Sequence, residues 1–159
     1  MRGADFQVSK LPMFHLNLLE RQHRLNSSRV LRRHGIDHRI WRVLVMLQEQ
    51  GPQSVHDLAA YGGFDRSTLS KIVDTTEERG FVARQVDRAD RRRSAVSLTN
   101  AGRDMIELAA PDIMSLFDAY FSDFSPEEVE QLMQMIVKLK TAVQSHGLDM
   151  ERGQLRENA

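Results

Sequence analysis

A run of four arginines and two aspartates occupies residues 87–94, DRADRRRS, and is the segment of the sequence best suited to binding an anion. Like charges this close together repel one another, so the run implies a polyanionic neighbour outside the local chain. Guanidinium groups bind phosphate oxygens through paired hydrogen bonds, and a DNA backbone presents such oxygens at regular intervals. The alternative is a solvated turn whose charges only keep the protein soluble.

Short polar and cationic side chains stand at the start of an amphipathic segment that precedes this run. In DRSTLSKIVDTTEERG, residues 65–80, Asp65 can cap a helix and Gly80 can end it. The side chains expected to face the core recur at helical spacing: Leu69, Ile72, Val73 and Thr76. The side chains outside this stripe, which we expect to contact DNA, are Arg66, Ser67, Thr68, Ser70 and Lys71.

A shorter helix is predicted immediately upstream. Ser54 and Asp57 have the spacing of a capping box, which opens a helix through about Ala60. Gly62 and Gly63 can then form a tight turn. Two short helices joined by such a turn form a helix-turn-helix, whose second helix enters the major groove of DNA.

Two strands are predicted downstream, on either side of the arginine run. FVARQVD and SAVSLT alternate apolar and polar residues, which is typical of strands, so the run forms the tip of a β-hairpin. Such a tip can follow the phosphates or enter the minor groove, and its candidate contacts are Arg88, Arg91, Arg92 and Arg93. Asp87 and Asp90 are expected to hold particular guanidinium groups in place when DNA is absent. The arrangement predicts a winged helix-turn-helix over residues 37–99.

Two helices are predicted before this lobe. The first covers residues 10–33 and stops at Gly35, a suitable left-handed cap. Its apolar stripe, interrupted by Arg21, consists of Leu11, Phe14, Leu18, Leu25 and Ser28. Asp37 can cap the second helix, which ends at residues 50–52, and its expected apolar face is Ile40, Trp41, Leu44, Val45 and Leu47.

Two further helices are predicted after the hairpin. Thr99 or Asn100 caps the first, which continues to about Phe121 with a kink or break at Pro111. SPEE at residues 125–128 opens the last helix as a capping box. Its apolar stripe is Val129, Leu132, Ile136, Leu139 and Val143. Residues after about 146 are polar and are expected to fray.

The expected fold is mainly α with a small β-hairpin wing, in one domain over residues 1–159. A helix-turn-helix lobe covers only half of a palindromic site, so such proteins bind DNA as dimers. The helices at 10–35 and 100–146 carry apolar stripes that need a partner, and we expect them to form a homodimer. The alternative is that each stripe packs within its own chain.

Three segments of this sequence resemble the MarR family of bacterial transcriptional regulators. DRSTLSKIVDTTEERGFV is similar to the family's recognition helix and following strand, DRADRR to its wing, and VSLTNAGR to the returning strand and next helix. The resemblance covers residues 10–145. Asp90 and Arg92 match the family's Asp-x-Arg wing pair, and Arg91 matches its cation at the wing tip. The YGGF turn departs from the family's usual single glycine, which leaves the angle between the two short helices open.

The resemblance also implies a repressor that a small molecule, often an aromatic acid or a phenol, releases from DNA. In that family the ligand lies between the dimer helices and the DNA-binding lobe. Arg21 can face a carboxylate from an apolar stripe, Trp41 can stack on an aromatic ring, and His15 can supply a polar contact. The alternatives are that Trp41 belongs to the core and that Arg21 forms a salt bridge.

Composition and charge narrow the function classes. Residues 1–103 hold 18 Lys and Arg against 11 Asp and Glu, whereas residues 104–159 hold 4 against 11, which favours a polyanion partner for the first part. The chain has no cysteine, no apolar run that could span a membrane and no secretory leader, so we expect a cytoplasmic protein without disulfides. His34 and His38 are separated by a helix break, and no metal or other cofactor site is predicted.

No nucleophile elbow, phosphate-binding glycine loop or zinc-protease motif is present, so no catalytic residues are predicted and an enzyme is not expected. The leading prediction is a dimeric, ligand-responsive DNA-binding repressor. The alternative is a winged-helix module that docks on an acidic protein surface and never contacts DNA.

Overall fold

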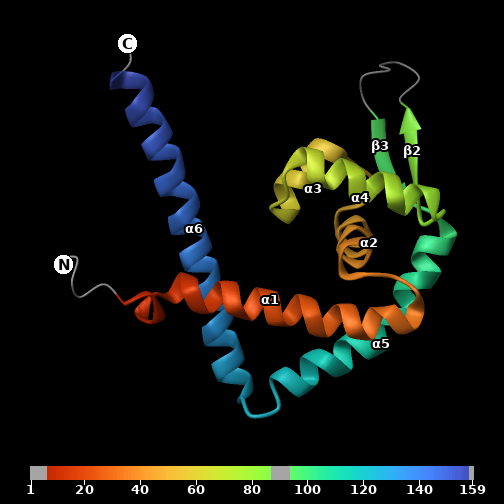
Figure 1. The fold of residues 1–159 in the computed structure, drawn as a ribbon, viewed down its shortest axis with the longest axis horizontal. Helices are drawn as coiled ribbons and strands as arrows, with labels where there is room; N and C mark the ends of the chain where they lie inside the picture. Colours follow the sequence, from red (N-terminus) through yellow and green to blue (C-terminus); the bar gives the residue numbers. More distant parts are fainter. Residues whose placement is uncertain (1–6, 87–93, 158–159) are drawn as a thin grey trace. The chain divides into compact units, whose positions relative to one another are not determined.

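The computed structural model describes residues 7–86 and 94–157, and the arginine-rich hairpin tip at 87–93 lies outside these ranges. The chain divides into two compact units, Met1–Leu116 and Phe117–Ala159. The first unit contains the helices α1 (Pro12–Leu31), α2 (His38–Gln50), α3 (Val55–Gly62) and α4 (Arg66–Glu78), together with all the described strands (Figure 1). Helix α5 (Asn100–Tyr120) starts in this unit, and α6 (Pro126–Glu157) lies in the second.

Side chains next to the helix starts explain where several helices begin. Asp37 accepts hydrogen bonds from the backbone N–H groups of Arg39 and Ile40, at 2.9 Å each, and so opens α2. Ser54 and Thr99 do the same for α3 and α5, respectively. The predicted caps of these helices are therefore confirmed. Asp65 precedes α4 as expected, but its side chain makes no capping hydrogen bond.

The capping box predicted at the start of α6 is also confirmed. The Ser125 N–H donates to the Glu128 carboxylate at 2.8 Å, and the Glu128 N–H donates to Ser125 Oγ at 3.3 Å. The helix then continues to Glu157, so the fraying expected after residue 146 is wrong. Polar composition alone does not stop a helix, and Gly147 and Gly153 lie inside α6 rather than at its end.

The sheet of the first unit has three antiparallel strands in the order β1-β3-β2. Strands β2 (Val82–Val86) and β3 (Ser94–Leu98) form the predicted hairpin, with Arg84 opposite Val96. Strand β1 (Gln53–Ser54) was not predicted, and it pairs with β3 through Gln53 opposite Val96. This third strand makes β3 the centre of the sheet and β2 an edge.

The core of the first unit lies where α2 packs against α1 and α4. The buried side chains of α2 are His38, Ile40, Trp41, Val43, Leu44, Met46 and Leu47. The predicted apolar face of this helix is therefore wrong at Val45, which is only half-buried, and omitted Val43 and Met46. A helix with neighbours on several sides buries more than one stripe, so helical period alone cannot identify all of its core residues.

Two other predictions about the long helices need correction. Pro111 lies inside α5, which continues to Tyr120, so the helix break that was one of the two alternatives there is wrong. Proline removes one backbone donor and crowds the preceding turn, which a long helix can accommodate. On α1, Leu18 and Leu25 of the predicted stripe are exposed, whereas Ser27 and Leu31 are buried. Gly35 ends this region with φ of 73°, as expected for a left-handed cap.

Candidate nucleic-acid interface

Helices α3 and α4 pack against each other as the predicted helix-turn-helix. Leu58 of α3 and Leu69 of α4 are both completely buried, which holds the two helices together. The chain leaves α3 through Gly63, whose φ of 65° favours glycine, and enters α4 after Asp65. Helix α3 runs to Gly62, two residues beyond the predicted end.

Helix α4 has one buried face and one open face, as its sequence predicts. Its buried residues are Leu69, Ile72, Val73 and Thr76. The Thr76 hydroxyl donates to the Ile72 carbonyl at 2.6 Å, so a polar side chain is accommodated in this core. Arg66, Ser67, Thr68 and Lys71 are exposed, and Ser70 is half-buried. The predicted contact residues of α4 therefore lie on its open side.

One flank of this open face borders the start of α2. A cleft of about 210 Å³ is lined by Asp37, Arg39, Ile40, Thr68, Lys71, Ile72 and Thr75. Arg39 pairs with Asp37 at 3.3 Å, but its side chain remains 68% exposed and is free to reach another anion. Arg39 was not among the residues predicted from the sequence to contact DNA. Its place beside α4 depends on the packing of α2 against α4, which no local pattern reveals.

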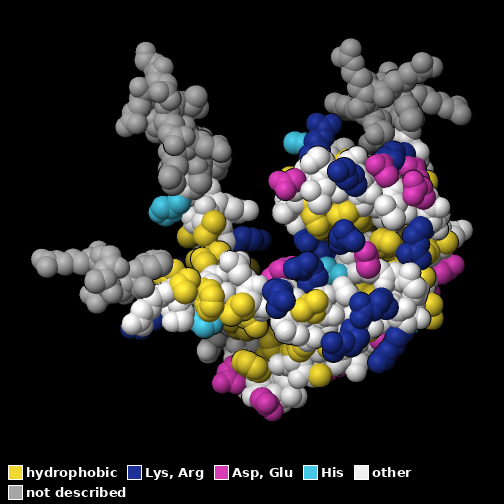
Figure 2. Space-filling view, in the orientation of Figure 1, with side chains coloured by type: hydrophobic (Ala, Val, Ile, Leu, Met, Phe, Trp, Pro, Cys, Tyr) yellow, Lys and Arg dark blue, Asp and Glu magenta, His cyan; other side chains and the backbone are white. Residues whose placement is uncertain are grey.

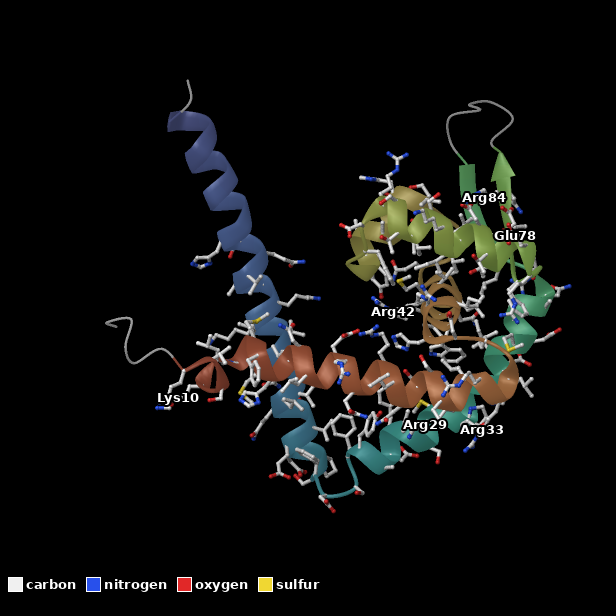
Figure 3. All side chains as sticks on the ribbon, viewed as in Figure 1. Lys10, Arg29, Arg33, Arg42, Glu78 and Arg84 are labelled. Carbon is white, nitrogen blue, oxygen red and sulfur yellow. The ribbon has the colours of Figure 1, made fainter. Side chains whose placement is uncertain are left out.

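The other flank borders strand β2, where Arg84 contacts two carboxylates of α4. Its Nη1 lies 2.6 Å from Glu77 Oε2, and its Nη2 lies 2.5 Å from Asp74 Oδ1. Figure 3 labels Arg84 at the base of the wing, beside α4. This network was not predicted, because in the sequence Arg84 is only a polar residue of an alternating strand.

Basic side chains extend beyond α4. Figure 2 shows Lys and Arg side chains spread over the visible face of the first unit, with fewer acidic ones among them. Arg29 and Arg33 near the end of α1 are exposed and belong to this face (Figure 3). The wing-tip candidates Arg88, Arg91, Arg92 and Arg93, with Asp87 and Asp90, lie outside the described residues. The described part of the lobe is thus open, polar and basic beside α4.

A polar cluster joins α1 to α2 inside the first unit. The Ser27 hydroxyl donates to the His23 carbonyl at 2.7 Å, and Ser27 Oγ lies 2.8 Å from Nδ1 of His38. Because the serine proton is used by that carbonyl, His38 donates from Nδ1. Burial, followed by the nearby His23 and Arg42, lowers the pKa of His38 to about 4. His38 is therefore neutral at physiological pH, and its role is structural.

The three residues predicted to bind a small molecule lie in different surroundings. Trp41 is 9% exposed and belongs to the core of the lobe. His15 is exposed and its Nε2 lies 2.7 Å from the Ser9 carbonyl, while Arg21 is exposed on α1. None of the three lines the cleft beside α4. Their proposed role stays a prediction.

The described residues present no group of three or more His, Asp or Glu side chains that could hold a metal ion. Within the same residues, no helix is both long enough and apolar enough to cross a membrane.

Comparison with known proteins agrees with the geometry of this lobe. The model of the MarR family matches residues 34–93, which span α2, the helix-turn-helix and the first part of the wing. The transcriptional repressor IacR of Pseudomonas putida is 27% identical over 132 residues, which cover 83% of this chain and 79% of that protein. The chain belongs to the MarR family.

Solved structures of MarR-family proteins share the whole fold. A MarR/EmrR family transcriptional regulator from Acinetobacter sp. superposes with a TM-score of 0.82 at 23% identity, covering 88% of this chain and 99% of that one. CouR from Rhodococcus jostii, solved with bound p-coumaroyl-CoA, superposes with a TM-score of 0.71 at 28% identity, covering 83% of this chain and 92% of that one. The mainly helical architecture with a small antiparallel wing is therefore that of a MarR-family transcriptional regulator, as predicted.

Proposed function

We propose that this MarR-family protein binds a palindromic DNA operator as a homodimer and represses transcription until a small molecule releases it. The main support for this proposal is the open face of α4. Ser67, Thr68 and Lys71 are exposed on this face, and both of its flanks also have cationic side chains. Short hydroxyl and ammonium side chains at this place on a recognition helix reach base edges in the major groove.

The phosphate contacts follow from the two sides of α4. Arg66 and Lys71 project from the helix itself, and Arg39 borders the cleft on the α2 side. We propose that the arginine run, Arg88, Arg91, Arg92 and Arg93, supplies further phosphate contacts in the minor groove, which is narrow and strongly negative. Cations on both flanks of one helix suit a duplex whose two strands border the groove that the helix enters.

Dimerisation is supported by apolar side chains that each unit leaves open. In the first unit, Leu18 and Leu25 of α1 and Leu108 of α5 are between 46% and 60% exposed. In the second unit, Met133, Met135, Ile136, Val137 and Val143 of α6 are exposed. Large apolar side chains so numerous on a monomer mark an interaction surface. A second copy of the chain is the partner that a two-fold operator requires.

The effector that we propose is an aromatic acid or its thioester. The MarR relative CouR, whose structure contains p-coumaroyl-CoA, supports this ligand class for a protein of the same fold. In this chain Arg21 is the candidate anchor for a carboxylate, because it is exposed on α1 and makes no ion pair among the described residues. Trp41 would form an apolar wall beneath the ligand, and His15 a polar contact.

The experiment that tests this function is selection of genomic fragments by the purified protein, followed by footprinting. We expect one protected palindrome with half-sites about one helical turn apart, which corresponds to one dimer. A transcription assay from that promoter then distinguishes repression from activation. A protein that selects no DNA and is instead captured by acidic protein surfaces would overturn the proposal.

A further inference from the structure

Arg84 connects the wing to the recognition helix through three separate hydrogen bonds. Its backbone N–H donates to Glu77 Oε1 at 2.8 Å, its Nη1 donates to Glu77 Oε2, and its Nη2 donates to Asp74 Oδ1. The hydrogen bond with Asp74 contributes most to raising the pKa of Arg84. The guanidinium is planar and forked, so it can bind both carboxylates at once and fix their relative positions.

The place of Arg84 in the sheet gives these bonds a structural consequence. β2 is an edge strand, and the Arg84 N–H points away from β3 towards α4. The helix therefore supplies a carboxylate that satisfies an edge donor of the sheet. The Arg84 side chain is only 29% exposed, so its bonds are partly shielded from water. Strand and helix are held at a defined separation by side chains from both.

The same bonds decide the charge of the DNA-facing side of α4. Asp74 lies three residues after Lys71, so the two occupy neighbouring positions on the helix surface. The Asp74 carboxylate is 50% exposed and would repel a phosphate if it were unpaired. Arg84 offers it a positive partner that comes from another element. The α4 surface thereby keeps the charge of Arg66 and Lys71 without opposition from Asp74 and Glu77.

We infer that Arg84 is a positioning residue for operator recognition: it sets the wing against α4 and neutralises two carboxylates of α4, without itself contacting a phosphate. The inference rests on the proposed function, since it concerns how the protein selects DNA. It assigns to Arg84 a different role from Arg66, which is exposed and whose charge is available to DNA.

Two other roles for Arg84 predict different behaviour. If Arg84 contacted a phosphate directly, its loss would weaken binding to every DNA. It would also lower the slope of log affinity against log salt by about one. If it only stabilised the fold, its loss would lower the melting temperature and leave the operator preference of the folded protein unchanged. If Arg84 is a positioning residue, its loss should reduce the preference for the operator over unrelated DNA. The salt dependence of binding to operator DNA should stay the same.

The test compares three variants of the full-length protein with the wild type. Arg84→Gln removes the forked guanidinium, and Arg84→Lys keeps one positive charge. The double variant Asp74→Ala with Glu77→Ala removes both acceptors and leaves the arginine. Affinities for the operator and for an unrelated duplex of equal length are measured by fluorescence anisotropy at several salt concentrations. Melting curves and circular dichroism establish which variants are folded.

The double variant is the decisive one, because it adds positive charge to the surface while breaking the link. We expect its affinity for unrelated DNA to rise and its preference for the operator to fall about tenfold. Arg84→Gln should lose a similar preference with an unchanged salt slope, and Arg84→Lys should recover only part of it. Equal gains of the double variant on both DNAs, or a salt slope lowered by about one in Arg84→Gln, would overturn the inference.

A readout without DNA separates this inference from the proposed function. Hydrogen exchange of the Arg84 amide, which the Glu77 carboxylate protects, should accelerate about tenfold or more in Glu77→Ala, which removes the acceptor, while the Val73 amide inside α4 stays protected. If wild-type protein prefers no DNA sequence, the proposed function fails, and the inference about operator recognition fails with it. If exchange at Arg84 is unchanged in Glu77→Ala, the positioning link itself is absent, whatever the DNA results.

Discussion

The Nδ1 atom of His38 lies 2.8 Å from Oγ of Ser27, and this contact joins α2 to α1 in the core of the first unit. Both residues are almost fully buried, with exposed fractions of 8% and 1%. A neutral imidazole fits this place because burial, the largest cause, lowers the pKa of His38 to about 4. Protonation of this buried imidazole is therefore disfavoured while the chain is folded.

We predict that the free energy of unfolding falls as pH is lowered from 6.5 to 4. The unfolded chain binds a proton at His38 near pH 6.5, whereas the folded chain resists it until about pH 4, so acid favours unfolding. The loss attributable to His38 is roughly 2–3 kcal/mol. Urea titrations at several pH values measure it.

The variant His38→Gln should flatten most of this pH dependence, although His23, whose pKa is also lowered, retains a share. His56→Gln on the surface of α3 is the matched control and should leave the profile unchanged. A His38→Gln profile as steep as that of the wild type would show that another group is responsible.

Substitutions on the open face of α4 should distinguish side chains that contact bases from side chains that contact the DNA backbone. We expect Ser67→Ala and Thr68→Ala to cost about 1–3 kcal/mol on the operator and much less on random DNA, because base contacts exist only on the correct sequence. Binding to sets of operators with single substitutions would locate the relaxed base pair. Equal losses on operator and random DNA would make these residues phosphate contacts instead.

The arginine run should behave as a phosphate-binding wing. Arg91→Ala is expected to weaken operator and unrelated DNA by similar factors and to lower the slope of log affinity against log salt by about one. Arg92→Ala should be at least as harmful, since its predicted pairing with Asp90 would be lost too. An unchanged salt dependence in both variants would mean that the wing does not contact DNA.

The apolar stripe of α6 should be part of the dimer interface. Ile136 is 39% exposed and Leu132 is half-buried within the single chain, so replacing both with glutamate puts two charges where a second copy is expected. We predict a monomer with reduced operator affinity, measured by sedimentation. Gln131→Glu, on an exposed position of the same helix, is the control and should stay dimeric. A dimer that survives the double change would place the interface elsewhere.

Arg21 should be needed for release by the effector rather than for DNA binding. The effector must bind the DNA-free form more tightly than the DNA-bound form, because equal affinity shifts no population. Arg21→Ala is therefore expected to bind the operator normally and to resist release by benzoates, cinnamates and their thioesters. Arg24→Ala, which removes another exposed arginine of α1, serves as the control. Normal release of Arg21→Ala would place the pocket elsewhere, and loss of DNA binding would make Arg21 structural.

Short-range patterns in the sequence were enough to locate the recognition helix and its two faces. Asp65 and Gly80 bracket α4, and Leu69, Ile72, Val73 and Thr76 are its buried residues as predicted. The caps at Asp37, Ser54, Thr99 and Ser125 were equally predictable. Each of these features depends on residues within about four positions of one another, so the spacing in the chain carries the information.

Long-range contacts decided the rest. Strand β1 has two residues and no periodic pattern, and it exists because β3 offers it hydrogen bonds from across the sheet. Val43 and Met46 are buried because α2 meets more than one neighbour. Arg84 meets Asp74 and His38 meets Ser27 only after separate elements have packed. Side chains ten or eleven positions apart carry no mark in the sequence that pairs them, because the energy of such a contact depends on a distance that only the folded chain sets.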